Sequence, residues 1–146
     1  IGPPAYNRLY RKIGNVNRLL AWGHARALED LLERQPDCPR ALSDQFGNKQ
    51  TVRNALMKHG RAITLEQRPK AESDVAVAAA SILARDEFVR RLQSLGETVG
   101  ATLPKGAGQP VRTVAADILR SKGADALRSV AKEHFRTFNQ ILELGG

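Results

Sequence analysis

The sequence contains little that would indicate a disulfide-stabilised or membrane-bound protein. Its 146 residues include one cysteine, Cys38, which can form neither an internal disulfide nor a cysteine-based zinc site on its own. No stretch approaches the roughly 18 consecutive apolar residues needed to cross a bilayer. The N-terminus, which does not begin with Met, lacks the charged and apolar regions of a signal peptide. We therefore expect a cytoplasmic protein in a reducing compartment.

Aromatic residues are also scarce, at 5%, whereas positive charge is in excess. The chain has 23 Lys and Arg against 15 Asp and Glu, which gives a formal net charge of +8 and a pI of about 10.3. Most of the cations are arginines, and they are spread among acidic residues along the whole chain. A basic globular protein of this kind favours a polyanionic partner such as nucleic acid.

The chain length fits one domain with a core of its own. After an extended start at Pro3 and Pro4, apolar spacing, caps and breakers predict a helix, a strand, a helix and a strand, over residues 15–34, 40–46, 49–59 and 62–67. Asn48 is the predicted cap of the second helix and Gly60 its stop. A strand, helix and strand in this order predict two parallel neighbouring strands whose carboxyl ends share one edge.

The second half of the chain is predicted to be helical. Residues 74–85 are small and apolar on nearly all sides, so we expect this helix to be buried at its start and to become amphipathic later. A loop at 102–108 is followed by helices at 111–121 and 124–142, split at Lys122 and Gly123. Two parallel strands alone do not form a stable sheet, so other chains or an absent upstream segment must supply the missing strands.

Two acidic residues fall at the predicted sheet edge, where open α/β sheets hold ligands. Asp44 ends the first strand and Glu72 follows the second. Paired carboxylates there are suited to Mg²⁺, although both residues could instead serve as turn or helix caps, and Asp74 competes with Glu72 for the role. Lys70 and Lys105, on loops near the same edge, could bind phosphate.

Other catalytic signatures are missing. His24, His59 and His134 have no metal-binding spacing, and we interpret them as core or surface residues, with His134 a hydrogen-bonded core residue. The serines lack a nucleophile-elbow setting, and the loop at 103–108 lacks the spacing of a nucleotide-binding P-loop.

Taken together, several motifs resemble ribonuclease HIII of the type 2 ribonuclease H family. They are Asn-Val-Asn-Arg-Leu-Leu-Ala-Trp-Gly-His-Ala-Arg, Ser-Asp-Gln-Phe, Lys-Ala-Glu-Ser, Val-Ala-Ala-Ala-Ser-Ile-Leu-Ala-Arg, Leu-Pro-Lys-Gly-Ala-Gly and Lys-Glu-His-Phe, at residues 15–26, 43–46, 70–73, 77–85, 103–108 and 132–135. They occur in the family's order and extend over nearly the whole chain.

The resemblance implies a ribonuclease H-like α/β fold in which four carboxylates bind two divalent metals, Mg²⁺ or Mn²⁺. Asp44 matches the third acid and Glu72 the fourth, which makes both of them catalytic and metal-binding residues. The family's Asp-Glu-Ser-Gly-Lys-Gly-Asp stretch, which carries the first two acids, is not in this sequence. Residues 1–146 therefore correspond to a truncated catalytic domain, a βαβ unit with C-terminal helices, without the first strands and the N-terminal TATA-box-binding-protein-like domain.

The implied activity is two-metal hydrolysis of RNA in RNA–DNA hybrids, giving 5′-phosphate products. Lys70, Ser73, Lys105 and Gly106 are the expected substrate-binding residues, and no membrane is involved. The required partner is the missing N-terminal part of the same domain, and the oligomeric state stays open. Because two of the four acids are absent, we expect little or no nuclease activity from this polypeptide by itself.

Two alternative interpretations of the sequence stay open. The chain could be a non-catalytic basic helical module that binds nucleic acid or protein, with its acids acting only as caps. It could also belong to the ribonuclease HII branch, which carries a tyrosine after the long helix. Here the only tyrosines are Tyr6 and Tyr10, which favours ribonuclease HIII.

Overall fold

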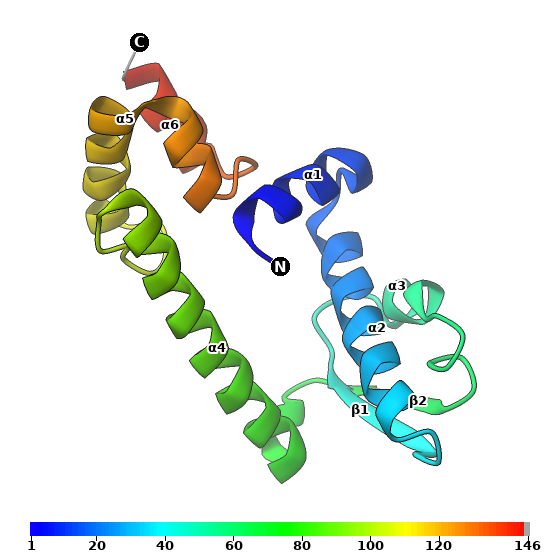
Figure 1. Ribbon diagram of the computed structural model, residues 1–146. Helices are drawn as coiled ribbons and strands as arrows, with labels where there is room; N and C mark the ends of the chain where they lie inside the picture. The colour runs from blue at the N-terminus through cyan, green and yellow to red at the C-terminus, as the bar shows by residue number, and fades with distance from the viewer. Residues whose placement is uncertain (145–146) are drawn as a thin grey trace. The chain divides into compact units, whose positions relative to one another are not determined.

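The computed structural model describes residues 1–144, which form two compact units (Figure 1). One unit is Ile13–Ala84, and the other combines Ile1–Lys12 with the chain from Arg85 onward. The helices are α1 Pro3–Ile13, α2 Val16–Arg34, α3 Lys49–Ala55, α4 Val75–Val99, α5 Gln109–Val130 and α6 Arg136–Leu144, and the short 3₁₀ turn η1 is Ala71–Ser73. The strands are β1 Arg40–Asp44 and β2 Thr64–Arg68. None of the helices among residues 1–144 combines the length and the apolar character that a membrane span requires.

The predicted strand–helix–strand crossover is confirmed. β1 and β2 pair in parallel, with Arg40 opposite Thr64 and Asp44 opposite Arg68. The Asn48 side chain caps α3 by accepting a hydrogen bond of 2.8 Å from the backbone N–H of Gln50. α3 ends at Ala55, earlier than predicted, and β2 begins two residues later than predicted because residues 56–63 form turns.

Helix α2 packs against α3 in the same unit. Asn15 caps α2 as its side chain accepts a 3.0 Å hydrogen bond from the N–H of Arg18, so the predicted helix start is confirmed. The buried face of α2 includes Leu19, Ala25 and Leu32, and the buried residue of α3 is Val52. The buried residues Ala21, Ala25, Glu29 and Leu32 follow one another at spacings of four, four and three, which places them along one side of α2.

The expected extended start of the chain is wrong. Residues Pro3 and Pro4 open helix α1 instead. Proline is tolerated in the first helical turn because the N–H groups of that turn have no partner within the helix, and its fixed φ already suits a helix.

Helix α4 confirms the predicted helix but not its predicted burial. Val75, Ile82 and Leu83 are 83%, 69% and 71% exposed. An apolar helix surface is buried only where another element covers it, and β1 and β2 are the only strands among the described residues. The expectation of a buried helix start is therefore wrong for this structure.

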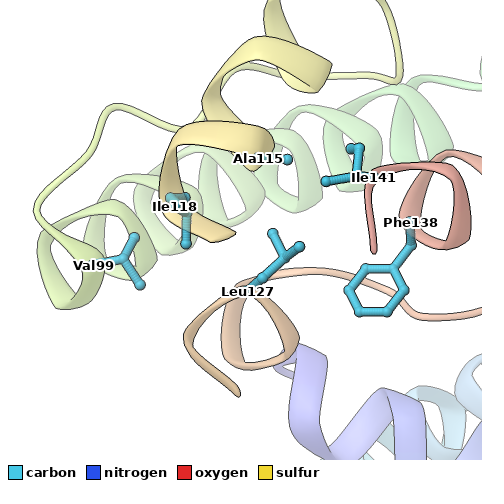
Figure 2. Close-up of a cluster of buried hydrophobic side chains, with 6 residues drawn as sticks. All are labelled: Val99, Ala115, Ile118, Leu127, Phe138 and Ile141. Atoms are coloured by element: carbon cyan, nitrogen blue, oxygen red, sulfur yellow. The ribbon is translucent and has the colours of Figure 1, made fainter. Parts of the chain in front are cut away.

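The second unit has its own apolar core. Figure 2 shows the side chains that form it, contributed by the end of α4, by α5 and by α6: Val99, Ala115, Ile118, Leu127, Phe138 and Ile141. The predicted split at 122–123 is confirmed, because α5 kinks where Gly123 adopts a φ of 83°.

The single final helix predicted over 124–142 is wrong, since α5 ends at Val130 and α6 begins at Arg136. The buried Asn7 side chain donates to the carbonyl of Ala131 at 3.0 Å and accepts from the N–H of Glu133 at 3.1 Å. These tertiary hydrogen bonds occupy backbone groups that a continuous helix would have paired internally.

Candidate metal-binding edge of the sheet

Asp44 and Glu72 lie on neighbouring segments at the carboxyl end of the parallel strand pair. Asp44 is the last residue of β1, and Glu72 is the middle residue of η1, which follows β2. The Oδ1 atom of Asp44 accepts a hydrogen bond of 3.1 Å from the N–H of Ala71, the residue that precedes Glu72. Both acidic residues are exposed, whereas Ala71 is buried and anchors the turn. One hydrogen bond thus holds the tip of β1 against the turn that carries the second carboxylate.

The capping alternative fits the contact of Asp44 with the Ala71 N–H, and Asp74, the competitor of Glu72, caps the next helix. The Oδ1 atom of Asp74 accepts a 2.9 Å hydrogen bond from the N–H of Ala76 at the start of α4, and its Oδ2 lies 3.9 Å from the Arg68 guanidinium. A carboxylate at a helix N-terminus is well placed to satisfy free N–H groups and the helix dipole. Glu72 has no hydrogen bond or ion pair with any residue in 1–144, so its carboxylate is available for another ligand.

Carboxylate oxygens suit a divalent cation, but the chain provides an incomplete set of them. Hard cations such as Mg²⁺ prefer oxygen ligands, and Asp44 keeps one oxygen that the Ala71 hydrogen bond does not use. No group of three or more His, Cys, Asp or Glu residues within the described chain could hold a metal ion. Asp44 and Glu72 alone are therefore fewer ligands than a divalent cation takes.

Lys70 and Ser73 flank Glu72 in the turn. Lys70 adopts a left-handed backbone conformation, with φ 53° and ψ 41°, and it is the only non-glycine residue with positive φ within the described chain. The N–H of Ser73 donates to the carbonyl of Lys70 at 3.2 Å and closes the turn. A β-carbon makes this conformation costly by about 1–2 kcal/mol, and such strain is concentrated at functional sites.

Lys105 and Gly106 belong to the other unit, on the loop that precedes α5. Both are exposed, and Gly106 has a φ of +92°, a conformation that glycine adopts without strain. Asp44 belongs to the first unit, and the role of Lys105 and Gly106 at the substrate stays a prediction.

His24, which the sequence predicts to be a core or surface residue, lies near the end of β1. Its Nδ1 lies 3.4 Å from the Ser43 hydroxyl oxygen, and its ring lies 4.8 Å from the Phe46 ring between centroids. Burial lowers the pKa of His24, and the opposing effect of the Asp44 charge does not reverse the shift. Its position within the matching stretch 15–26 was the available signal, but helical spacing alone did not show that this side of α2 meets the end of β1.

The sequence is similar to several proteins of a known family. A family model described as Ribonuclease HII matches residues 10–138. Ribonuclease HIII of Chlamydia pneumoniae is 46% identical over 140 residues, which make up 95% of this chain and 47% of that protein. Ribonuclease HIII of Protochlamydia amoebophila is 42% identical over 142 residues, with 97% of this chain and 47% of that protein covered.

The fold is also similar to a solved structure. The crystal structure of Bst-RNase HIII in complex with Mn²⁺ matches with a TM-score of 0.88 and 31% identity, over 99% of this chain and 48% of that one. The chain thus spans about half the length of the relatives it matches. The family model, in contrast, matches most of this chain. The chain therefore belongs to the ribonuclease HII family, and within it to the ribonuclease HIII type that the sequence motifs predict.

Proposed function

We propose that the chain is part of a ribonuclease that hydrolyses RNA in RNA–DNA hybrids, with Asp44 and Glu72 as half of its metal-binding carboxylates. The observation that carries the proposal is the hydrogen bond from Ala71 to Asp44, because it fixes the strand end beside the turn that holds Glu72. The other two carboxylates would come from sequence outside these 146 residues, in the first strands of a ribonuclease H-like fold. In this proposal the chain is one portion of that catalytic domain.

Each side chain of this edge has a distinct role in the proposal. Asp44 presents its free carboxylate oxygen while the Ala71 N–H fixes the orientation of the other oxygen. Glu72 contributes a carboxylate that no described residue engages. Lys70 and Ser73 lie next to Glu72 and would hold the phosphates that flank the scissile bond, with Lys105 and Gly106 as further substrate contacts. A divalent ion, Mg²⁺ or Mn²⁺, supplies an activated water and charge neutralisation when it is bound.

Two findings about similar proteins support the proposal. The relatives of similar sequence are named ribonuclease HIII, and the similar crystal structure is of an enzyme in complex with Mn²⁺. The excess of positive charge also suits a substrate with two phosphate backbones.

A reconstitution assay tests the proposal. The chain alone should cleave a labelled hybrid little or not at all in Mn²⁺. Together with the portion of Chlamydia pneumoniae ribonuclease HIII that it does not match, supplied as a second polypeptide, it should cleave the RNA strand. Asp44→Asn and Glu72→Gln should each abolish this cleavage, because they remove a charged metal ligand.

The matched control is Asp86→Asn, which removes an exposed acid of α4 that only pairs with Arg90. It should leave cleavage unchanged. Cleavage that survives in both Asp44→Asn and Glu72→Gln would contradict the proposal. Binding of the hybrid without any cleavage in the reconstituted mixture would instead support the non-catalytic basic module.

A further inference from the structure

Helix α1 has a positively charged surface that has no part in the proposed metal-binding edge. It contains Arg8, Arg11 and Lys12 and no acidic residue, and all three cations are exposed. Their spacing of three and four residues places them along one side of the helix. Arg11 pairs with Glu133 at 2.9 Å, whereas Arg8 and Lys12 have no ion-pair partner within residues 1–144.

This charged side is fixed to the rest of its unit by a buried polar residue. Asn7 is 4% exposed, and its side chain is bound to the backbone of Ala131 and Glu133 at 3.0 and 3.1 Å. The same amide lies 3.5 Å from the carbonyl of Arg128. The cations of α1 are therefore held in a defined position beside the segment that joins α5 to α6.

That segment carries the Lys-Glu-His-Phe motif at 132–135, which has no role in the proposed metal site. The Lys132 ammonium lies 4.5 Å from the centre of the Tyr6 ring on α1. The His134 ring stacks on Tyr10 at 4.4 Å and lies 4.1 Å from the Phe135 ring, which belongs to a half-exposed side chain. Because Tyr6 lies two residues before Arg8, its ring and Lys132 are on another side of α1 than the row of cations.

A shallow cavity of about 280 Å³ lies between α1 and the last turns of α5, and it is lined by the guanidinium-bearing residues Arg8, Arg11 and Arg128. Asp125 and Glu133 also line it, and they pair with Arg128 and Arg11 at 2.9 Å. The Asp125 side chain is 99% exposed, and an ion pair this exposed contributes little free energy, so an incoming anion can replace Asp125 at Arg128.

We propose that Arg8, Arg11, Lys12 and Arg128, here called the α1 basic surface, bind the phosphodiester backbone of nucleic acid without a metal ion. The planar guanidinium fork matches phosphate oxygens in pairs, and the cations of the surface outnumber its acids. The inference rests on the proposed function, because a hybrid nuclease requires a surface that follows its substrate's backbone. It adds to that function a contact in the unit that does not contain Asp44 and Glu72.

Metal-free binding of the whole chain tests the inference. Anisotropy of a labelled RNA–DNA hybrid is measured in EDTA as salt is raised from about 50 mM, since phosphate contacts make affinity fall steeply with salt. The Arg8→Gln/Lys12→Gln double variant should bind about tenfold or more weakly, and its slope of log affinity against log salt should be shallower by about 2. The control is Arg90→Gln/Arg120→Gln, which removes the same charge from exposed positions on α4 and α5 that do not line the cavity. It should weaken binding less than about twofold.

Three outcomes would overturn the inference. An equal loss of affinity in the two double variants would show that binding depends only on the net charge of the chain. Poly-glutamate and unlabelled hybrid are also compared as competitors at the same charge concentration. If poly-glutamate competes as effectively as the hybrid, the surface binds acidic peptide instead. No binding by the parental chain at the lowest salt would show that there is no such contact. EDTA separates this test from metal-dependent cleavage, so binding as expected with no reconstituted activity would contradict only the proposed nuclease function.

Discussion

Glu29 is the most buried carboxylate of the described chain, and its partners are all in the loop after α3. Its side chain is 7% exposed and accepts backbone hydrogen bonds from His59 at 2.8 Å and from Gly60 at 3.0 Å, while the His59 Nδ1 lies 3.1 Å away. Burial by itself would raise the pKa of Glu29, but the two N–H donors and the His59 ring outweigh it and lower the pKa below its ordinary value of 4.5.

The Glu29→Gln substitution should therefore lower the melting temperature at neutral pH, because an amide offers one acceptor oxygen where two are used. A carboxyl group with a depressed pKa in the folded state stabilises fully above its ordinary value of 4.5 and loses this effect as pH falls through the lower folded value. The gap in melting temperature between parent and variant should thus be constant above about pH 5 and close under more acidic conditions.

Thermal unfolding followed by circular dichroism across this pH range measures the effect. Glu33→Gln is the matched control, since Glu33 is exposed on the same helix. It should leave the melting temperature almost unchanged. A gap that persists undiminished well below pH 4.5, or none at pH 7, would contradict this account of Glu29.

Individual site residues could be predicted only where sequence motif and strand end coincide. Asp44 ends a recognisable strand and Glu72 follows the next, so both could be identified as candidates from the sequence. The left-handed backbone of Lys70 and the approach of His24 to Ser43 were not predicted. Both depend on how a turn closes and which side of a helix faces a strand, and those features are set by tertiary contacts.

At the scale of elements, the end of α4 depends on Gly96. The chain turns back sharply there, with the Ala101 N–H donating to the Gly96 carbonyl at 3.0 Å. A β-carbon at Gly96 would collide with the Ala101 carbonyl oxygen. Gly96→Ala should reduce the free energy of unfolding by about 1–3 kcal/mol, because the backbone on both sides must shift to make room.

Gly23 provides the comparison, since it lies inside α2 and a β-carbon added there would have no neighbouring atom within 4 Å. Gly23→Ala should raise the free energy of unfolding by up to about 1 kcal/mol, as alanine restricts the unfolded chain. Urea unfolding monitored at 222 nm measures both changes. If the free energy of unfolding changed with the same sign in the two variants, the collision at Gly96 would not be what determines the effect of the substitution.

The order and type of elements were largely predictable, because the strands, most helices and their caps follow local rules. The break between α5 and α6 was not, because nothing in the apolar stripe of 124–142 indicates that Asn7, far away in sequence, binds the backbone there. The helix at Pro3 was missed for a different reason, namely that proline both opens helices and marks extended chain.

At the scale of the whole molecule, the apolar start of α4 should govern association. Val75 and Ile82, seven residues apart, share one side of the helix, and Leu83 extends this exposed apolar surface. Contiguous exposed apolar surface promotes association, as do the unpaired outer edges of a two-stranded sheet. The chain should therefore self-associate with rising concentration, and Ile82→Gln/Leu83→Gln should shift it toward monomer without lowering its melting temperature.

Sedimentation velocity over a range of concentrations measures this association. Leu31→Gln is the control, because Leu31 is an isolated exposed side chain on α2, 62% exposed. It should leave the association unchanged. A parental chain that sediments as a monomer at every concentration, with a sharp thermal transition, would contradict the prediction.

The burial of residues 74–85 was predicted from composition alone. It is the largest difference between the sequence-based prediction and the structure. An alanine-rich run indicates that a helix is suited to close packing, but it does not identify the surface that covers it. The shortage of strands was, in contrast, recognisable from the sequence, because counting predicted strands needs no knowledge of tertiary contacts.

The most direct test of the central claim is a Mn²⁺ titration of the isotope-labelled chain followed by NMR. Paramagnetic broadening depends on proximity to the ion, so it detects even a weak, incomplete site. The account predicts that amide signals around Asp44 and residues 71–73 broaden first, and that Asp44→Asn and Glu72→Gln each remove this effect while Asp86→Asn does not. Early broadening elsewhere in the chain, or broadening at this edge that survives in both variants, would contradict the claim that these two carboxylates bind a shared metal ion.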